Sequence, residues 1–143
     1  MTVATSKRER ILQAIESALS AVAGIDGRVF RTLPDANPRE LQPYVALEWE
    51  SEAATPLSVP QIERTLTVVV SVLVRGDVPD TLADPIAVSV HALLMADPTL
   101  GGLAIDVMLK GARFEAVSAD QSAGKLTHEY DVLYRHSFAD MTA

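Results

Sequence analysis

The chain has 143 residues, no cysteine, and a formal net charge of −7 from 19 acidic and 12 basic side chains. This length supports one domain with a core. The missing thiols exclude disulfides, thiol catalysis and thiolate metal sites, and the acidic balance disfavours contact with a phosphate backbone. No apolar run approaches the roughly 20 residues that span a bilayer, and the polar start lacks a secretory signal. We therefore expect a single cytoplasmic domain, 1–143, that binds neither nucleic acid nor membrane.

The first expected element is a helix from about Ser6 to Ala23. Ser6 with Glu9 three residues later forms a capping-box pattern, and Gly24 can end the helix at positive φ. Residues 1–5 before it are expected to fray. The apolar positions have the three- and four-residue spacing of an amphipathic helix; they are Ile11, Ala14, Ile15, Ala18, Leu19 and Val22.

Two short strands are expected next, at Arg28–Thr32 and Tyr44–Trp49, with three prolines between them that break regular structure. The segment 50–61 that follows contains two prolines, small residues and no periodicity. It is predicted to be an exposed loop, and loops of this length are usually functional or disordered.

Three glutamates alternate at this boundary, so an extended chain would place Glu48, Glu50 and Glu52 on one face. Such a row could bind a hard cation, form a repulsive edge that discourages sheet aggregation, or make a charged contact surface. Plain solvation requires no further assumption, and the sequence favours it.

A long strand is predicted at Ile62–Arg75, where β-branched residues alternate with polar ones. Its second half is apolar on both faces, which is typical of a strand in the middle of a sheet.

A second helix is predicted from Asp80, as its cap, to Ala96. Its expected buried stripe is Leu82, Ile86, Val90 and Leu93. The opposite side is either a solvated face or a contact surface for another subunit; it carries Asp84, Val88, His91 and Met95.

Two long strands, Leu103–Ala116 and Lys125–Arg135, are expected to form a hairpin around the polar turn Asp120–Gly124. Residues 139–143 after it are expected to fray. The order of elements predicts an α+β fold, with a mainly antiparallel sheet of about five strands and two helices packed on one face. The other face, rich in polar residues, would remain available for assembly.

No motif for chemistry is present. Ser122-Ala123-Gly124-Lys125 lacks the first glycine and the final Ser or Thr of a phosphate-binding loop, and there is no nucleophile elbow. His128 and His136 would lie about 27 Å apart on one strand, too far to share a metal. We expect no catalytic, metal-binding or cofactor-binding residue.

Five segments together resemble a known family: Arg-x-Arg-Ile-Leu at Arg8–Leu12, Pro43–Val45, the strand Thr65–Arg75, Asp97–Leu103 and Tyr130–Arg135. Their order and spacing over Ser6 to Phe138 resemble the tail terminator proteins of long-tailed bacteriophages. These are the lambda-like minor tail or tail completion proteins.

The resemblance implies a late structural protein without cofactor or enzymatic activity. Such a protein forms a hexameric ring that caps the tail tube, stops its polymerisation and presents a surface to the head–tail connector. The virion, at the head-proximal end of the tail, would be its location. The resemblance also implies a flexible loop that orders on the tube; segment 50–61 matches it, with Glu50, Glu52, Leu57 and Val59 as candidate contacts. The alternatives are a head closure or neck protein, or a small-ligand-binding domain or enzyme.

Overall fold

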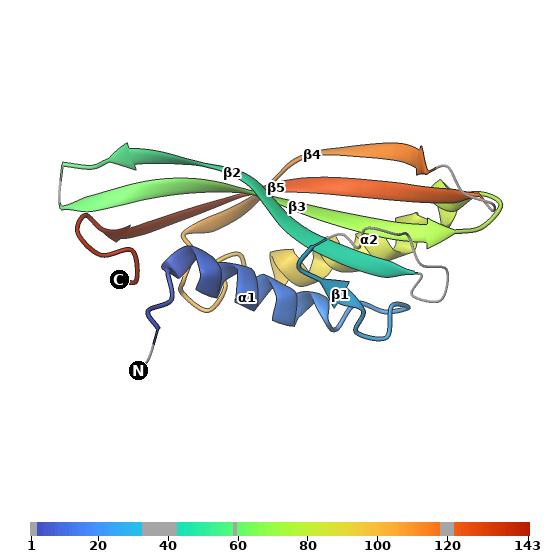
Figure 1. Ribbon diagram of the computed structural model, residues 1–143, viewed down its shortest axis with the longest axis horizontal. Coiled ribbons are helices and arrows are strands. Elements are labelled where there is room, and N and C mark those ends of the chain that lie inside the picture. The colour runs from blue at the N-terminus through green and yellow to red at the C-terminus, as the bar shows by residue number, and fades with distance from the viewer. Residues whose placement is uncertain (1–2, 33–42, 59, 118–121) are drawn as a thin grey trace.

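The computed structural model describes residues 3–32, 43–58, 60–117 and 122–143. In this part of the chain the elements are α1 (Lys7–Leu19), β1 (Val29–Phe30), β2 (Tyr44–Pro56), β3 (Gln61–Arg75), α2 (Pro79–Ala96), β4 (Asp106–Val117) and β5 (Ala123–Ser137). The strands form one sheet in the order β1-β2-β3-β5-β4. All pairings are antiparallel except that of β1 with β2. Both helices lie on one side of the elongated sheet (Figure 1). The predicted α+β fold is confirmed, and β3 is central.

Helix α1 begins as the sequence predicts, because the Ser6 hydroxyl accepts a hydrogen bond from the backbone N–H of Glu9 at 3.1 Å. It ends at Leu19, before the expected Ala23. Gly24, at φ +91°, belongs to the turns that follow the helix.

The predicted cap of α2 at Asp80 is wrong. Val78 holds the cap position without a side-chain hydrogen bond, and Pro79 opens the first turn, where its missing N–H costs nothing. The expected buried stripe is only partly correct, since Leu82 is exposed and Leu93 is half-buried. The buried side of α2 combines two alanines with three larger aliphatic residues; these are Ala83, Ile86, Ala87, Val90 and Leu94.

The main core lies between the helices and one face of the sheet. Alternate residues of β3 from Leu66 to Val74 point into it, together with Tyr130, Val132 and Tyr134 of β5. On the other face, buried hydroxyls are paired: Thr67 donates to Asp131 at 2.8 Å, and the hydroxyls of Ser71 and Thr127 lie 3.2 Å apart. A small second cluster on that face contains Tyr44, Ala46 and Leu73, with Phe30 packed against it.

The prediction that 50–61 is a loop is wrong. Strand β2 continues to Pro56 and β3 begins at Gln61, so only residues 57–60 connect the two strands. The weak β-propensity of this alanine- and serine-rich segment is overridden by pairing with the long β3, which β5 holds on its other side. Pro56 is tolerated as the last residue of β2, at the end of the strand.

A β-bulge in β2 also corrects the predicted row of glutamates. The register shifts between Trp49 and Ser51, so that Glu48 lies opposite Val69 whereas Glu52 lies opposite Leu66. Because neighbouring positions of β3 point to opposite faces, Glu48 and Glu52 are on different faces. The single extra residue turns Glu52 toward the helices.

The C-terminal residues 139–143, expected to fray, are attached to α1. The backbone N–H of Lys7 donates to the carbonyl of Met141 at 2.8 Å, and the Arg10 guanidinium donates to the carbonyl of Thr142. The Asp140 carboxylate accepts from both the N–H and the hydroxyl of Thr142. The hydrogen bonds from Lys7 and Arg10 link residues about 130 positions apart, which is why local sequence patterns do not reveal them.

The β4–β5 hairpin is confirmed, but the expected turn Asp120–Gly124 is placed too late, because Ala123 and Gly124 already belong to β5; residues 120 and 121 lie outside the described residues. Near the turn end of the hairpin the ring of Phe114 lies over Gly124. A Cβ on Gly124 would come within 2.6 Å of two Phe114 ring carbons and 2.9 Å of Pro79 Cβ. Only glycine leaves room here for the start of α2 to approach the sheet.

We therefore expect Gly124→Ala to destabilise the protein by about 1–3 kcal/mol, the usual cost of overpacking. Urea denaturation measures the change. Gly111→Ala in β4 is the matched control, because a Cβ there meets nothing within 4 Å. Equal midpoints for the two variants would contradict the close packing.

Candidate assembly surfaces

A cluster of polar side chains lies around Glu52, whose side chain is only 4% exposed. Its Oε1 accepts hydrogen bonds from Arg64 at 2.5 Å and from Arg8 at 3.2 Å, and its Oε2 accepts one from the Tyr134 hydroxyl at 2.6 Å. The Arg8 guanidinium also lies 4.7 Å from the ring centre of Trp49. We call Glu52, Arg8, Arg64 and Tyr134 the Glu52 cluster.

The buried His136 extends this cluster. Its Nε2 accepts a hydrogen bond from Arg64 Nε at 2.8 Å, and its Nδ1 lies 2.8 Å from the carbonyl oxygen of Ser137. Each polar group thus has a partner, as buried polar groups require. The cluster joins α1 to β2, β3 and β5 and anchors the hairpin formed by β2 and β3.

The predicted partner-binding residues of this segment therefore differ in availability. Glu50 is exposed, Leu57 is half-buried, and Val59 is outside the described residues. Glu52 is buried and neutralised by two guanidinium groups, so the expectation that it meets a partner directly is wrong. Sequence reasoning missed the cluster because the bulge beside Glu50 decides which face Glu52 occupies.

All three tyrosines of the chain are buried. Burial raises the pKa of Tyr44 and raises that of Tyr130 to about 12. For Tyr134, burial and the hydrogen bond to Glu52 raise the pKa still further. Since an unfolded tyrosine ionises near pH 10, the stability of the fold is complete below pH 10 and falls as the pH rises toward the folded-state values.

We expect the native protein to show clearly less tyrosinate absorbance at about pH 10.5 than the chain in denaturant, because burial raises the pKa of all three tyrosines. Tyr130 alone would make folding roughly 2 kcal/mol less favourable by about pH 12. A spectrophotometric titration, with circular dichroism recorded on the same samples, tests this. Ionisation near pH 10 in a chain that is still folded would contradict the burial.

The predicted contact face of α2 is only partly exposed. Asp84 and Val88 are exposed and His91 is half-buried, its Nδ1 3.1 Å from the Tyr130 hydroxyl. Met95 instead packs against the core, so its predicted place on a free contact face is wrong. Asp84, Val88 and His91 line a shallow groove of about 360 Å³ between α2 and β4. The other residues that line it are Ala87, Ala92, Leu109 and His128. Burial, aided by the nearby His91, lowers the pKa of His128.

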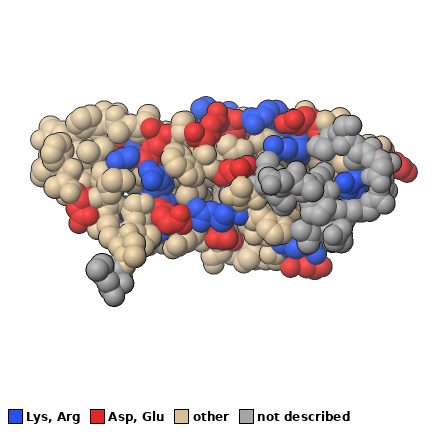
Figure 2. Space-filling model, viewed as in Figure 1, with Lys and Arg blue, Asp and Glu red and all other residues tan. Residues whose placement is uncertain are grey.

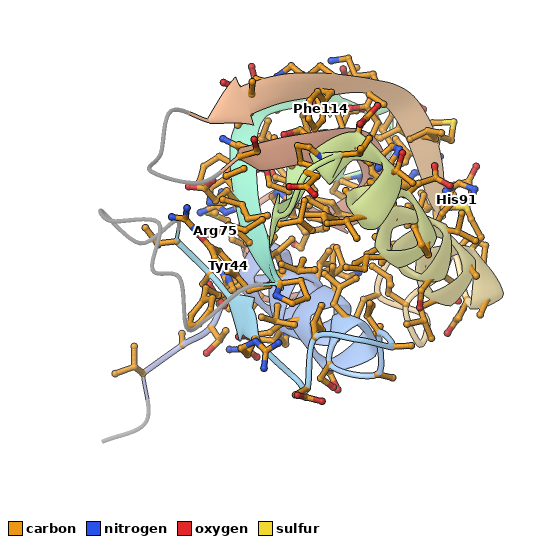
Figure 3. The ribbon with its side chains drawn as sticks, turned by 90° about the vertical axis from the view of Figure 1, so that its right-hand side faces the viewer. Tyr44, Arg75, His91 and Phe114 are labelled. Carbon is orange, nitrogen blue, oxygen red and sulfur yellow. The ribbon has the colours of Figure 1, made fainter. Side chains whose placement is uncertain are left out.

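Exposed apolar side chains are concentrated beside this groove. Of the eleven large hydrophobic residues that are exposed in the described part of the chain, seven belong to α2, β4 or the residues directly before them. We call them the α2–β4 surface: Val78, Leu82, Val88, Ile105, Met108, Leu109 and Phe114. In Figure 3, His91 and Phe114 mark this side of the molecule, away from Tyr44 and Arg75. A concentration of exposed apolar side chains of this kind is typical of a protein–protein contact.

The end of the β2–β3 hairpin is uncharged. No Asp, Glu, Lys or Arg occurs between Glu52 and Glu63. The corresponding left-hand end of the molecule is largely tan in Figure 2, while acidic and basic groups mix over the middle. The molecule thus offers an uncharged tip and a separate apolar side.

The described residues contain no group of three or more His, Asp or Glu side chains that could hold a metal ion. Neither α1 nor α2 is long and apolar enough to cross a membrane. Within the described part of the chain, the most distinctive features are therefore surfaces.

The chain has an α+β fold in which both helices lie on one face of a five-stranded sheet. No family model and no curated protein match the sequence. Among solved structures, a chain from the virion of a native gene transfer agent particle is similar in fold, with a TM-score of 0.56. The likeness covers 87% of this chain and 94% of the other at 13% sequence identity. At this identity it establishes a shared fold.

Proposed function

We propose that this chain is a structural subunit of a phage-like virion. The observation that carries the proposal is the fold shared with a virion chain over nearly the whole length of both. The sequence resemblance to phage tail proteins points in the same direction. Apolar and uncharged surfaces are what an assembly subunit needs, since association is driven chiefly by their burial.

Within the virion, we propose the role of tail terminator. Six copies form a ring that caps the tail tube, stops its growth and receives the head–tail connector. A ring needs two different complementary patches on each subunit, and we assign one of them to the α2–β4 surface with Asp84, Val88 and His91. The tip of the β2–β3 hairpin, with Leu57 and Val59, contacts the tube, and the nearby Glu50 steers toward basic groups. The role involves no bond-making chemistry.

The test is tube polymerisation from purified tail tube subunits, with and without this chain. Electron microscopy should show short tubes of limited length, each closed at one end, when the chain is present. Tubes of unlimited length with bare ends would overturn the terminator role. Pull-downs separate the nearest alternative, because a neck protein would retain the connector and leave tube growth unchanged.

A further inference from the structure

Both sides of the sheet present unpaired strand edges. Among the described residues, no strand pairs with the outer edge of β4, which is twelve residues long. On the opposite side, β1 pairs with β2 only at Val45 and Ala46. Within the described part of the chain, this leaves the outer edge of β2 from Leu47 to Pro56 without a strand partner. Exposed edges of this length are templates for pairing with another chain.

The two edges carry opposite charge at their exposed positions where they lie level. The register places Asp106–Ala112 of β4 level with Leu47–Ala53 of β2, and in that stretch of β4 the one fully exposed charged residue is Lys110. From Leu47 to Pro56 the only charged residues of β2 are three glutamates, and of these Glu52 is buried. Two copies of the β2 edge would therefore repel each other, whereas Lys110 of one copy attracts the glutamates on the β2 edge of another.

The edges also match in position. Trp49, Val68, Tyr130 and Leu109 form one row across the sheet. Trp49 and Leu109 end the row at the two outer edges, and both are nearly half exposed. Each is followed directly by a bulge residue, Glu50 in β2 and Lys110 in β4. A neighbour placed side by side thus brings Trp49 and Leu109 to one level, with Lys110 on the Glu48 side of that level and Glu50 on its other side.

The strand directions agree with this arrangement. Going from β2 through β3 and β5 to β4 reverses the chain direction three times, so β4 is antiparallel to β2. In copies that all point the same way, β4 and the next copy's β2 would continue the antiparallel sheet.

We propose that copies of this chain associate head to tail through these edges, with Asp106–Ala112 of each copy's β4 seated against Leu47–Ala53 of the next. The contact is heterologous, so it excludes a two-fold dimer and forms a ring when the rotation between copies closes. Leu109 is buried against the neighbour's Trp49, and Lys110 lies beside Glu48, with Glu50 diagonally across from it. The proposal rests on the proposed function, because it identifies the contact between neighbouring subunits of that ring.

Charge reversal tests the contact in the full chain. Glu50→Lys and Lys110→Glu are each expected to weaken self-association about tenfold or more, because each opposes like charges at an exposed position. The double variant, and an equimolar mixture of the two single variants, should regain assembly because opposite charges meet again. Analytical ultracentrifugation at low salt, where charge attraction is least screened, gives the masses. Asp77→Lys, an exposed change of the same sign as Glu50→Lys, is the control and should assemble as the wild type does.

Each outcome either supports or overturns the head-to-tail contact. Rescue in the double variant and in the mixture supports the head-to-tail contact. Single variants that assemble normally, a double variant that stays dissociated, or a wild type that stays monomeric up to the highest soluble concentration would overturn it. Circular dichroism confirms that each variant is folded. A ring that passes these tests yet leaves tube growth unchanged would refute the terminator role and leave the contact standing.

Discussion

Replacing Glu52 by alanine is expected to destabilise the fold by about 3 kcal/mol, the lower end of the range for breaking a buried ion pair. The substitution leaves Arg64 and the Tyr134 hydroxyl without their acceptor in a site where Glu52 itself is 4% exposed. Arg8 retains some solvent, which limits the cost. The urea midpoint at constant slope gives the change in the free energy of unfolding.

Glu50→Ala is the matched control for this variant, since Glu50 is two residues away, is equally charged, and is exposed. Its effect should stay within about 0.5 kcal/mol. Tyr134→Phe, which removes one hydrogen bond and leaves both arginines paired, should cost about 1 kcal/mol. A Glu52→Ala variant as stable as the control would show that the cluster does not hold the hairpin to α1.

Replacing Leu57–Pro60 with Asn-Gly is expected to abolish tube capping while leaving the fold intact. The segment connects two strands paired up to Pro56 and Ile62, and Asn-Gly followed by Gln61 keeps that register with a three-residue loop, a common hairpin length. Since Ser58 and Pro60 are exposed, little stability should be lost. Tube length distributions measure capping, and thermal denaturation measures stability.

A variant in which the order of residues Leu57–Pro60 is shuffled is the control, because it keeps the length and composition of the hairpin tip but changes its shape. If the Asn-Gly variant caps tubes as the wild type does, the hairpin tip is not the surface that meets the tube. A variant that fails only because it has unfolded would be recognised by its circular dichroism spectrum.

Strong local periodicity explains what could be predicted from the sequence. The alternation in Ile62–Arg75 identified the central strand, and the Ser6–Glu9 pattern identified the start of α1. Both signals are contained within a few residues. The strand at 50–56 could not be predicted in this way, because its alanines, serines and prolines have little β-propensity. Only pairing with β3 makes this segment a strand.

The candidate surfaces depend on information that the sequence does not display. One inserted residue at the bulge moves Glu52 to the core face, and no residue type in this segment indicates that a bulge is present. Asp84 and Val88 lie on an exposed side of α2 as expected, whereas Met95 is half-buried against the core. The opposite charges of Glu50 and Lys110 become meaningful only once the strand order leaves the edge of β4 and most of the outer edge of β2 unpaired in the described part of the chain.

The central claim is that this protein acts as a ring at the end of a tube. Electron cryomicroscopy of tubes assembled with the chain tests it most directly, by reconstruction of the tube ends. The account predicts a closed ring of about six copies on one end, with the β2–β3 hairpin toward the tube. Ends without density for this chain, or copies distributed along the tube wall, would contradict it.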